Sequence, residues 1–69
     1  MRQRMNVTVN GQTEAIEDAS SVADLISRMG FKSQALAVEI NGQLVPREKF
    51  DRRLEDGDRV EVVTLVGGG

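Results

Sequence analysis

The sequence predicts an α+β protein in which a mixed sheet of four to five strands carries one main helix across one face. Three observations predict this class: apolar and polar residues alternate near both ends of the chain, two Asn-Gly pairs mark tight turns, and one segment between them has apolar residues at helical spacing. The 69 residues include no cysteine, so the fold depends on one hydrophobic core without disulfides. We expect one domain over residues 1–66 and a flexible glycine tail over 67–69.

The first hairpin is predicted around Asn10 and Gly11. Residues 5–9 alternate between apolar and polar types, which is the pattern of a strand with one buried face. Asn-Gly suits a type I′ turn because both central residues need a positive φ. A second strand should therefore return antiparallel over 12–17, with Ile16 as its clearest core residue.

A helix is predicted next, because apolar residues recur at i, i+3, i+4 and i+7. These residues are Val22, Leu25, Ile26 and Met29. The hydroxyl of Ser20 or Ser21 can accept a hydrogen bond from the first unpaired amides of the helix, and Gly30 is expected to end it in a left-handed cap. A lone helix of this length is unstable in water, so its apolar stripe should pack on a sheet.

The second half supplies the remaining strands. Alternation predicts a strand over 36–40, a tight turn at Asn41-Gly42 and a short strand over 43–45, which Pro46 ends. The final strand is expected over 59–66. The first and last strands should lie side by side in the centre of the sheet. Two residues of the long connection, Phe50 and Leu54, are expected to reach the core.

The composition argues against several classes of function. Without cysteine or histidine the chain lacks the commonest nucleophile, neutral-pH base and metal ligands, so neither an enzyme nor a metal site is expected. A net charge of −2 and the absence of tyrosine and tryptophan disfavour nucleic acid as a partner. No apolar run approaches the roughly 18 residues of a membrane span, so a cytoplasmic location is the expectation.

The glycine tail directs attention to the end of the chain. Glycines have no side chain to bury, so Gly67 and Gly68 can pass through a slot that any Cβ would obstruct. The reactive group would be the carboxylate of Gly69, which an adenylating enzyme could convert to an acyl-adenylate for attack by a sulfur or nitrogen nucleophile. A frayed end or a linker remnant would look similar in sequence.

A family resemblance covers nearly the whole chain. The stretch Ala-Val-Glu-Ile-Asn-Gly-Gln-Leu-Val-Pro-Arg at 37–47, the Asp-Gly-Asp at 56–58 and the glycine end together resemble the thiamine sulfur carriers of the ThiS type. These are β-grasp, ubiquitin-like proteins. The family minimum is two terminal glycines, so Gly67 is extra, whereas Gly68 and Gly69 match the family pattern.

The resemblance implies a carrier cycle in which partners supply the chemistry. An adenylating enzyme related to ubiquitin-activating enzymes would use ATP and magnesium to activate Gly69, and a cysteine desulfurase or other persulfide donor would provide sulfur. The resulting thiocarboxylate would pass its sulfur to thiazole synthase, and the carrier itself would bind no cofactor. Alternatives are a carrier for molybdopterin or cysteine synthesis, a ubiquitin-like protein modifier, and a passive interaction domain.

A docking surface is expected beside the tail. If Val60 and Val62 of the last strand face the core, Val63 and Leu65 point to the opposite side of the sheet, where Ala37 is expected beside them. A shift of the register by one residue would exchange the faces. The basic residues Arg47, Lys49, Arg52, Arg53 and Arg59 suggest either contact with an acidic partner or an ordinary solvated segment.

Overall fold

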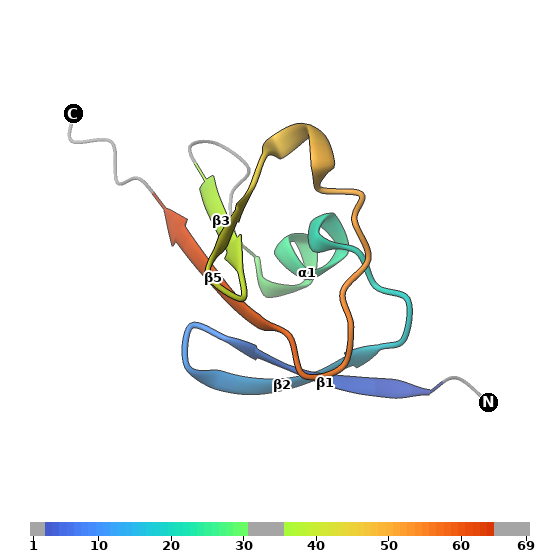
Figure 1. The fold of residues 1–69 in the computed structure, drawn as a ribbon. Coiled ribbons are helices and arrows are strands. Elements are labelled where there is room, and N and C mark those ends of the chain that lie inside the picture. The colour runs from blue at the N-terminus through green and yellow to red at the C-terminus, as the bar shows by residue number, and fades with distance from the viewer. Residues whose placement is uncertain (1–2, 31–35, 65–69) are drawn as a thin grey trace.

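The computed structural model describes residues 3–30 and 36–64, and for Leu36 it describes the backbone alone. In these residues five strands form one sheet, with an α-helix and a short 3₁₀ helix (Figure 1). The elements are β1 (Arg4–Val9), β2 (Gln12–Glu17), α1 (Val22–Met29), β3 (Leu36–Ile40), β4 (Gln43–Val45), η1 (Arg47–Lys49) and β5 (Arg59–Thr64). The predicted α+β class is confirmed.

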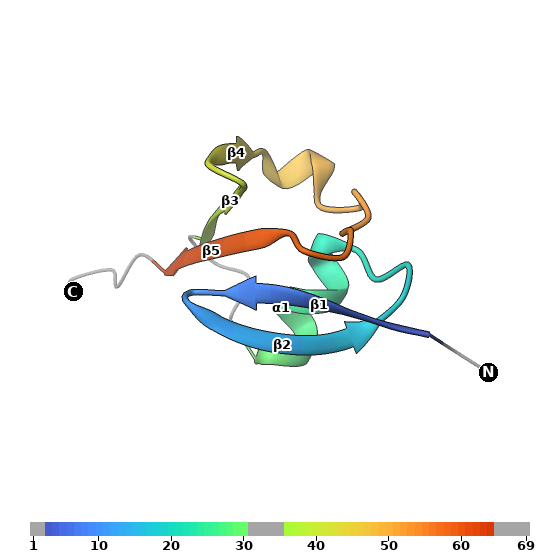
Figure 2. The ribbon, with the colours of Figure 1, turned by 60° about the horizontal axis from the view of Figure 1, so that its bottom comes forward.

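The sheet is mixed and has the order β2-β1-β5-β3-β4. β1 and β5 are parallel neighbours in its middle, whereas β2, β3 and β4 each pair antiparallel with a neighbour. Figure 2 shows β5 between β1 and β3, with α1 behind the sheet. The prediction that the first and last strands lie side by side in the centre is therefore confirmed.

Both hairpins turn at the predicted Asn-Gly pairs. Asn10 and Gly11 have φ of 49° and 87°, and Asn41 and Gly42 have 53° and 84°. Positive φ at both central residues defines the type I′ turn, whose twist matches that of the flanking strands. Local sequence thus sets the pairing of β1 with β2 and of β3 with β4.

Helix α1 begins and ends as the sequence predicts. Ser21 is its N-cap: its Oγ accepts the N–H of Asp24 at 3.0 Å, and its own N–H donates to Asp24 Oδ2 at 2.9 Å. This capping box decides between the two candidate serines, because the Ser20 hydroxyl instead donates to the carbonyl of Glu17. Gly30 ends the helix in the left-handed conformation with φ 78°.

One core lies between the sheet and α1. Its buried residues are Met5, Val7, Val9, Ile16, Val22, Leu25, Ile26, Val38, Ile40, Val45, Leu54, Val60 and Val62, with Met29 and Phe50 partly buried against them. Val60 and Val62 point into this core, so the expected register of the last strand is confirmed over its described part. No helix within 3–30 and 36–64 has the length and apolar character needed to cross a membrane.

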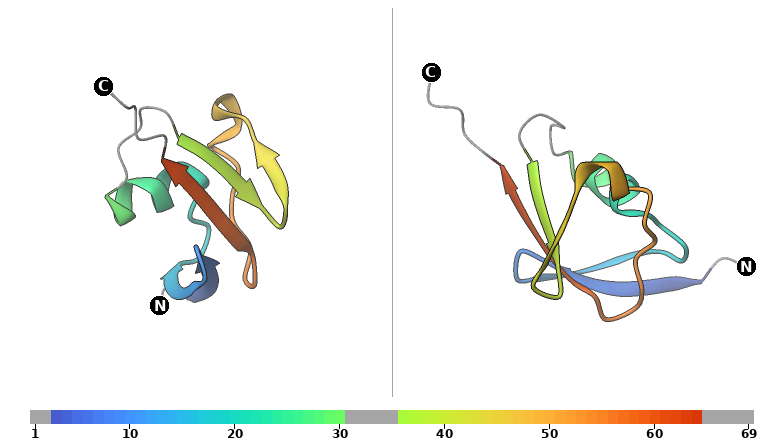
Figure 3. Two further views of the ribbon diagram at one scale, coloured as in Figure 1. Left: turned by 90° about the vertical axis from the view of Figure 1, so that its left-hand side faces the viewer. Right: turned by 45° about the horizontal axis from the view of Figure 1, so that its top comes forward.

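The long connection from β4 to β5 passes beside the first turn of α1 (Figure 3). Backbone hydrogen bonds attach it there: Val22 N–H donates to the carbonyl of Arg52, and Ala23 N–H to that of Phe50, both at 2.9 Å. Leu54 N–H donates in turn to the Ser20 carbonyl at 2.8 Å. The connection is therefore held to the helix end, although most of it is neither helix nor strand.

Candidate functional site

The helix-free face of the sheet carries the residues expected to contact a partner. Val63 on β5 is 51% exposed, and Ala37 on β3 lies directly opposite it in the antiparallel register. The structure thus brings these two predicted residues together on the expected face. Leu65 and the glycines 67–69 lie outside the described residues.

Leu44 on β4 belongs to the same face, and the sequence reasoning missed it. It is 66% exposed. Among the described residues, Leu44 and Val63 are the large apolar side chains that are exposed to solvent. Its cross-strand neighbour is Glu39, which faces away from the core. Counting outward from the Asn41-Gly42 turn would have revealed this orientation, because directly opposed residues point to the same side of a sheet.

Two glutamates share this face with the apolar residues. Glu39 and Glu61 are directly opposite each other on β3 and β5, and both are exposed. Cβ atoms of such a pair are about 5 Å apart, so the two carboxylates repel each other. Neither forms an ion pair with another described residue. We call the surface made by Ala37, Glu39, Leu44, Glu61 and Val63 the docking face.

The side chain of Asn10 fixes the position of β5. Asn10 Oδ1 accepts the Val62 N–H at 2.8 Å, and Asn10 Nδ2 donates to the Val62 carbonyl at 3.2 Å. The Asn10 backbone N–H donates to the Val60 carbonyl at 2.9 Å. A side-chain amide therefore extends the pairing of β1 with β5 as far as Val62, which is next to Val63 of the docking face.

A second asparagine joins the β3–β4 turn to the start of β5. Asn41 Oδ1 accepts the Arg59 N–H at 2.9 Å, while its Nδ2 donates to Asp58 Oδ1 at 3.1 Å. Asp58 is buried, and its other oxygen accepts the Glu55 N–H at 2.9 Å. Asn41 and Asp58, both in the motifs that carry the family resemblance, thus support the fold rather than contribute reactive groups.

The described residues offer little acid–base or metal chemistry. The backbone N–H and the hydroxyl of Ser21 hydrogen-bond to the Asp24 carboxylate and hold its pKa below the ordinary value. Asp24 is part of the helix cap and not of the docking face. No group of three or more acidic residues within 3–30 and 36–64 is arranged to hold a metal ion.

Known proteins resemble this chain over nearly all of its length. Residues 3–69 match the ThiS family. The crystal structure of the thiamine biosynthesis protein ThiS from Geobacter metallireducens has a TM-score of 0.81 and 36% identity, and the match covers 94% of this chain and 100% of that one. The sulfur carrier protein ThiS of Thermus thermophilus is 36% identical over 64 residues, covering 91% of this chain and 98% of that protein.

One of the longer relatives is an enzyme. The thiazole synthase of Paramagnetospirillum magneticum is 32% identical over 66 residues. The match covers 94% of this chain but only 20% of the synthase. A region similar to nearly all of this chain is therefore present within a much larger protein.

Proposed function

The chain belongs to the ThiS family of sulfur carriers, and on this basis we propose that it carries sulfur as a thiocarboxylate on Gly69 for the formation of thiazole in thiamine biosynthesis. The observation that carries the proposal is the family match, which extends through residue 69 and so includes the glycines of the tail. The β-grasp fold expected from the resemblance is confirmed by the G. metallireducens structure.

The proposed chemistry takes place at the carboxylate of Gly69. In the adenylating enzyme this carboxylate attacks the α-phosphate of ATP, pyrophosphate leaves, and an acyl-adenylate forms with magnesium balancing the phosphate charge. The terminal sulfur of a persulfide then attacks the acyl carbon, and AMP leaves. A second thiol cleaves the remaining S–S bond, which releases the thiocarboxylate and oxidises the two thiols to a disulfide.

This cycle requires no catalytic side chain on the carrier. ATP, magnesium and the persulfide, supplied by a cysteine desulfurase or another donor, belong to the partners. The carrier has to dock on them and present Gly69, with Gly67 and Gly68 narrow enough to enter an active site. This division of roles is consistent with a chain that has neither histidine nor cysteine.

We assign the docking face to the adenylating enzyme. Val63 and Leu44 are exposed apolar side chains on a sheet that the helix leaves uncovered, and β5 leads towards the tail. Glu39 and Glu61 add two carboxylates to this face, and neither forms an ion pair with a described residue. The partner surface that complements this face is apolar and carries a lysine or arginine over the glutamate pair, where it would neutralise their repulsion.

Thiazole synthase is the proposed sulfur acceptor. The P. magneticum thiazole synthase includes a region similar to this chain, which supports a working relationship between a carrier of this kind and that enzyme. The thiocarboxylate sulfur would be transferred to the growing thiazole ring, and the carrier would return with a free carboxylate on Gly69.

Adenylation is testable by ATP–pyrophosphate exchange with the adenylating enzyme of the same organism. We expect exchange with the unmodified chain, none after deletion of Gly68 and Gly69 together, and at least about tenfold less with Val63→Asp, which places a charge in an apolar contact. Thr13→Asp is the matched control, because Thr13 is an exposed residue of β2 away from Val63. Exchange without Gly68 and Gly69 would contradict the chemistry, and unchanged exchange with Val63→Asp would contradict the docking face.

A further inference from the structure

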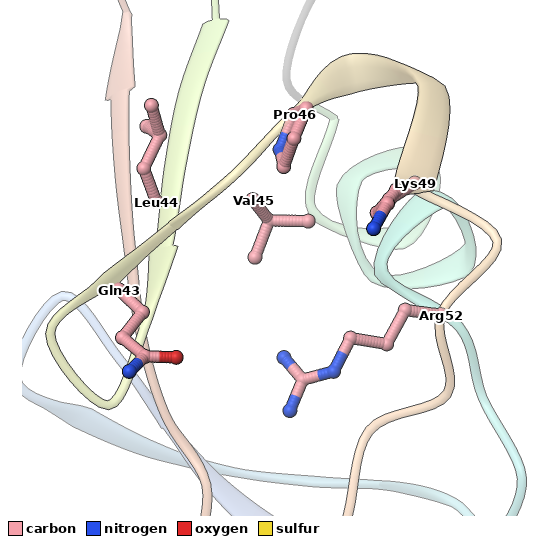
Figure 4. A pocket seen from close by; sticks show the side chains of 6 residues that line it. All are labelled: Gln43, Leu44, Val45, Pro46, Lys49 and Arg52. Atoms are coloured by element: carbon pink, nitrogen blue, oxygen red, sulfur yellow. The ribbon is translucent and has the colours of Figure 1, made fainter.

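A groove opens beside β4 and η1. Its volume is about 270 Å³, and its lining residues are Gln43, Leu44, Val45, Pro46, Lys49 and Arg52 (Figure 4). Because β4 is the last strand of the sheet in the order β2-β1-β5-β3-β4, the groove runs along an open strand edge. Open edges can accept a further strand from another chain.

The register identifies which backbone groups face this groove. A two-residue hairpin loop is closed by a hydrogen-bonded pair, here Ile40 and Gln43, so the next pair, Glu39 with Leu44, is not hydrogen-bonded. The N–H and C=O of Leu44 therefore point away from β3, towards the open edge. Neither group has a hydrogen-bond partner among the described residues.

Two cations also border the groove. The Arg52 side chain extends towards Gln43 from the opposite wall, and Lys49 projects from η1 on the same side as Arg52 (Figure 4). Neither side chain forms an ion pair with a described residue. Hydrogen bonds hold the backbone of Lys49 and Arg52 in place: Arg52 N–H donates to the Lys49 carbonyl at 3.0 Å, and the Arg52 carbonyl accepts the Val22 N–H at 2.9 Å.

We propose that this groove binds an extended, acidic segment of a partner protein. The segment would add to β4 as a short strand, exchanging hydrogen bonds with the N–H and C=O of Leu44, and a carboxylate of the segment would lie between Lys49 and Arg52. The free carbonyl favours a peptide over a small anion, since an anion would leave it unpaired and would be repelled by it. The site does not depend on sulfur chemistry at Gly69 and would persist if the proposed function failed.

The test is a titration of the isotope-labelled protein with a designed peptide, acetyl-Val-Glu-Val-Glu-Val-amide, followed by amide chemical shifts. We expect saturable shifts at residues 43–45, 49 and 52, with binding about three- to tenfold weaker for the same peptide carrying glutamine in place of glutamate. No saturable shift by about 10 mM peptide, or equal binding of both peptides, would overturn the proposal.

Protein variants separate the two parts of the site. Lys49→Gln combined with Arg52→Gln should remove the preference for the glutamate peptide, whereas Arg53→Gln, the same change at an exposed neighbour outside the groove, should keep it. Leu44→Pro removes the outward N–H without removing a bond to β3, so it should weaken both peptides, while Leu44→Val should not. A folded Leu44→Pro that binds both peptides as the unmodified chain does would refute strand addition.

A small anion tests whether the groove binds charge alone. Sodium acetate at equal ionic strength should give shifts at the Lys49 and Arg52 amides that are smaller and need higher concentration than those of the peptide. If acetate reproduces the shifts of Leu44 with the same concentration dependence, the groove is an anion site and the peptide proposal is wrong.

Discussion

Replacing Glu61 with glutamine should stabilise the protein, because it removes one of two like charges that face each other. Glu61 and Glu39 are directly opposed on β5 and β3 and are both exposed. Cβ atoms of opposed residues are about 5 Å apart. For two unit charges at that separation in water, Coulomb's law gives a repulsion of about 0.8 kcal/mol, which screening at 0.1 M salt lowers to about 0.5 kcal/mol. For a domain of this size that corresponds to a rise in Tm of about 2–4 °C.

Thermal and urea unfolding at 0.1 M and 1 M salt measure this effect. At 1 M salt the gain should fall below about 0.2 kcal/mol, because the Debye length is then about 3 Å. Glu39→Gln should give a similar gain, and the double variant should add little, since either change alone removes the repulsion. Glu48→Gln is the control, because Glu48 is an equally exposed glutamate that lies in η1, outside the sheet.

The same substitution should weaken docking while it stabilises the fold. If a partner cation lies over the pair, Glu61→Gln should lower the affinity for the adenylating enzyme at low salt, mainly through a slower association rate. If Glu61→Gln lowers the free energy of unfolding, or raises it equally at both salt concentrations, then Glu39 and Glu61 do not repel each other across the strands as proposed.

Three further predictions concern the core, the helix cap and the tail. Leu25→Ala should lower the free energy of unfolding by about 2–5 kcal/mol in urea denaturation, because Leu25 is buried between helix and sheet and leaves a cavity; a loss below about 1 kcal/mol would contradict its placement. Since Ser21 holds the pKa of Asp24 below 3.8, Asp24 stabilises the fold above that pH and the contribution disappears as pH falls through the lowered pKa. Asp24→Asn should therefore be less stable than the unmodified chain at pH 7, and melting curves should converge towards pH 2; a difference independent of pH would contradict the capping role. Gly68→Leu should abolish ATP–pyrophosphate exchange and leave the melting curve unchanged, whereas a lowered Tm would show that the tail contributes to the fold.

Local sequence was sufficient to predict most of the fold. The Asn-Gly turns require positive φ at two successive residues, and few other residue pairs allow it, so both hairpins could be located. The helix was equally clear, because its apolar spacing is bounded by a serine cap and by Gly30. The orientation of Val63 followed once Val60 and Val62 were assigned to the core, since strand residues alternate between faces.

The interactions that depend on distant parts of the chain could not be predicted. The hydrogen bond between Asn10 and Val62 requires β1 and β5 to be parallel neighbours, although Asn10 and Val62 are 52 positions apart in the sequence. One wall of the groove beside β4 is the segment around Arg52, which is held in place by hydrogen bonds to the first turn of α1. No local sequence pattern predicts these hydrogen bonds. The role of Gly69 stays a prediction from the resemblance, because it lies outside the described residues.

Sulfur transfer to the C-terminus can be followed through the intact mass of the protein after incubation with the adenylating enzyme, ATP, magnesium, a persulfide donor and a thiol. We expect a gain of about 16 Da, one oxygen exchanged for sulfur, which disappears when Gly68 and Gly69 are deleted together. An unchanged mass under conditions that support ATP–pyrophosphate exchange would contradict a sulfur carrier. An isopeptide adduct with a protein lysine in place of the thiocarboxylate would assign the chain to protein modification instead.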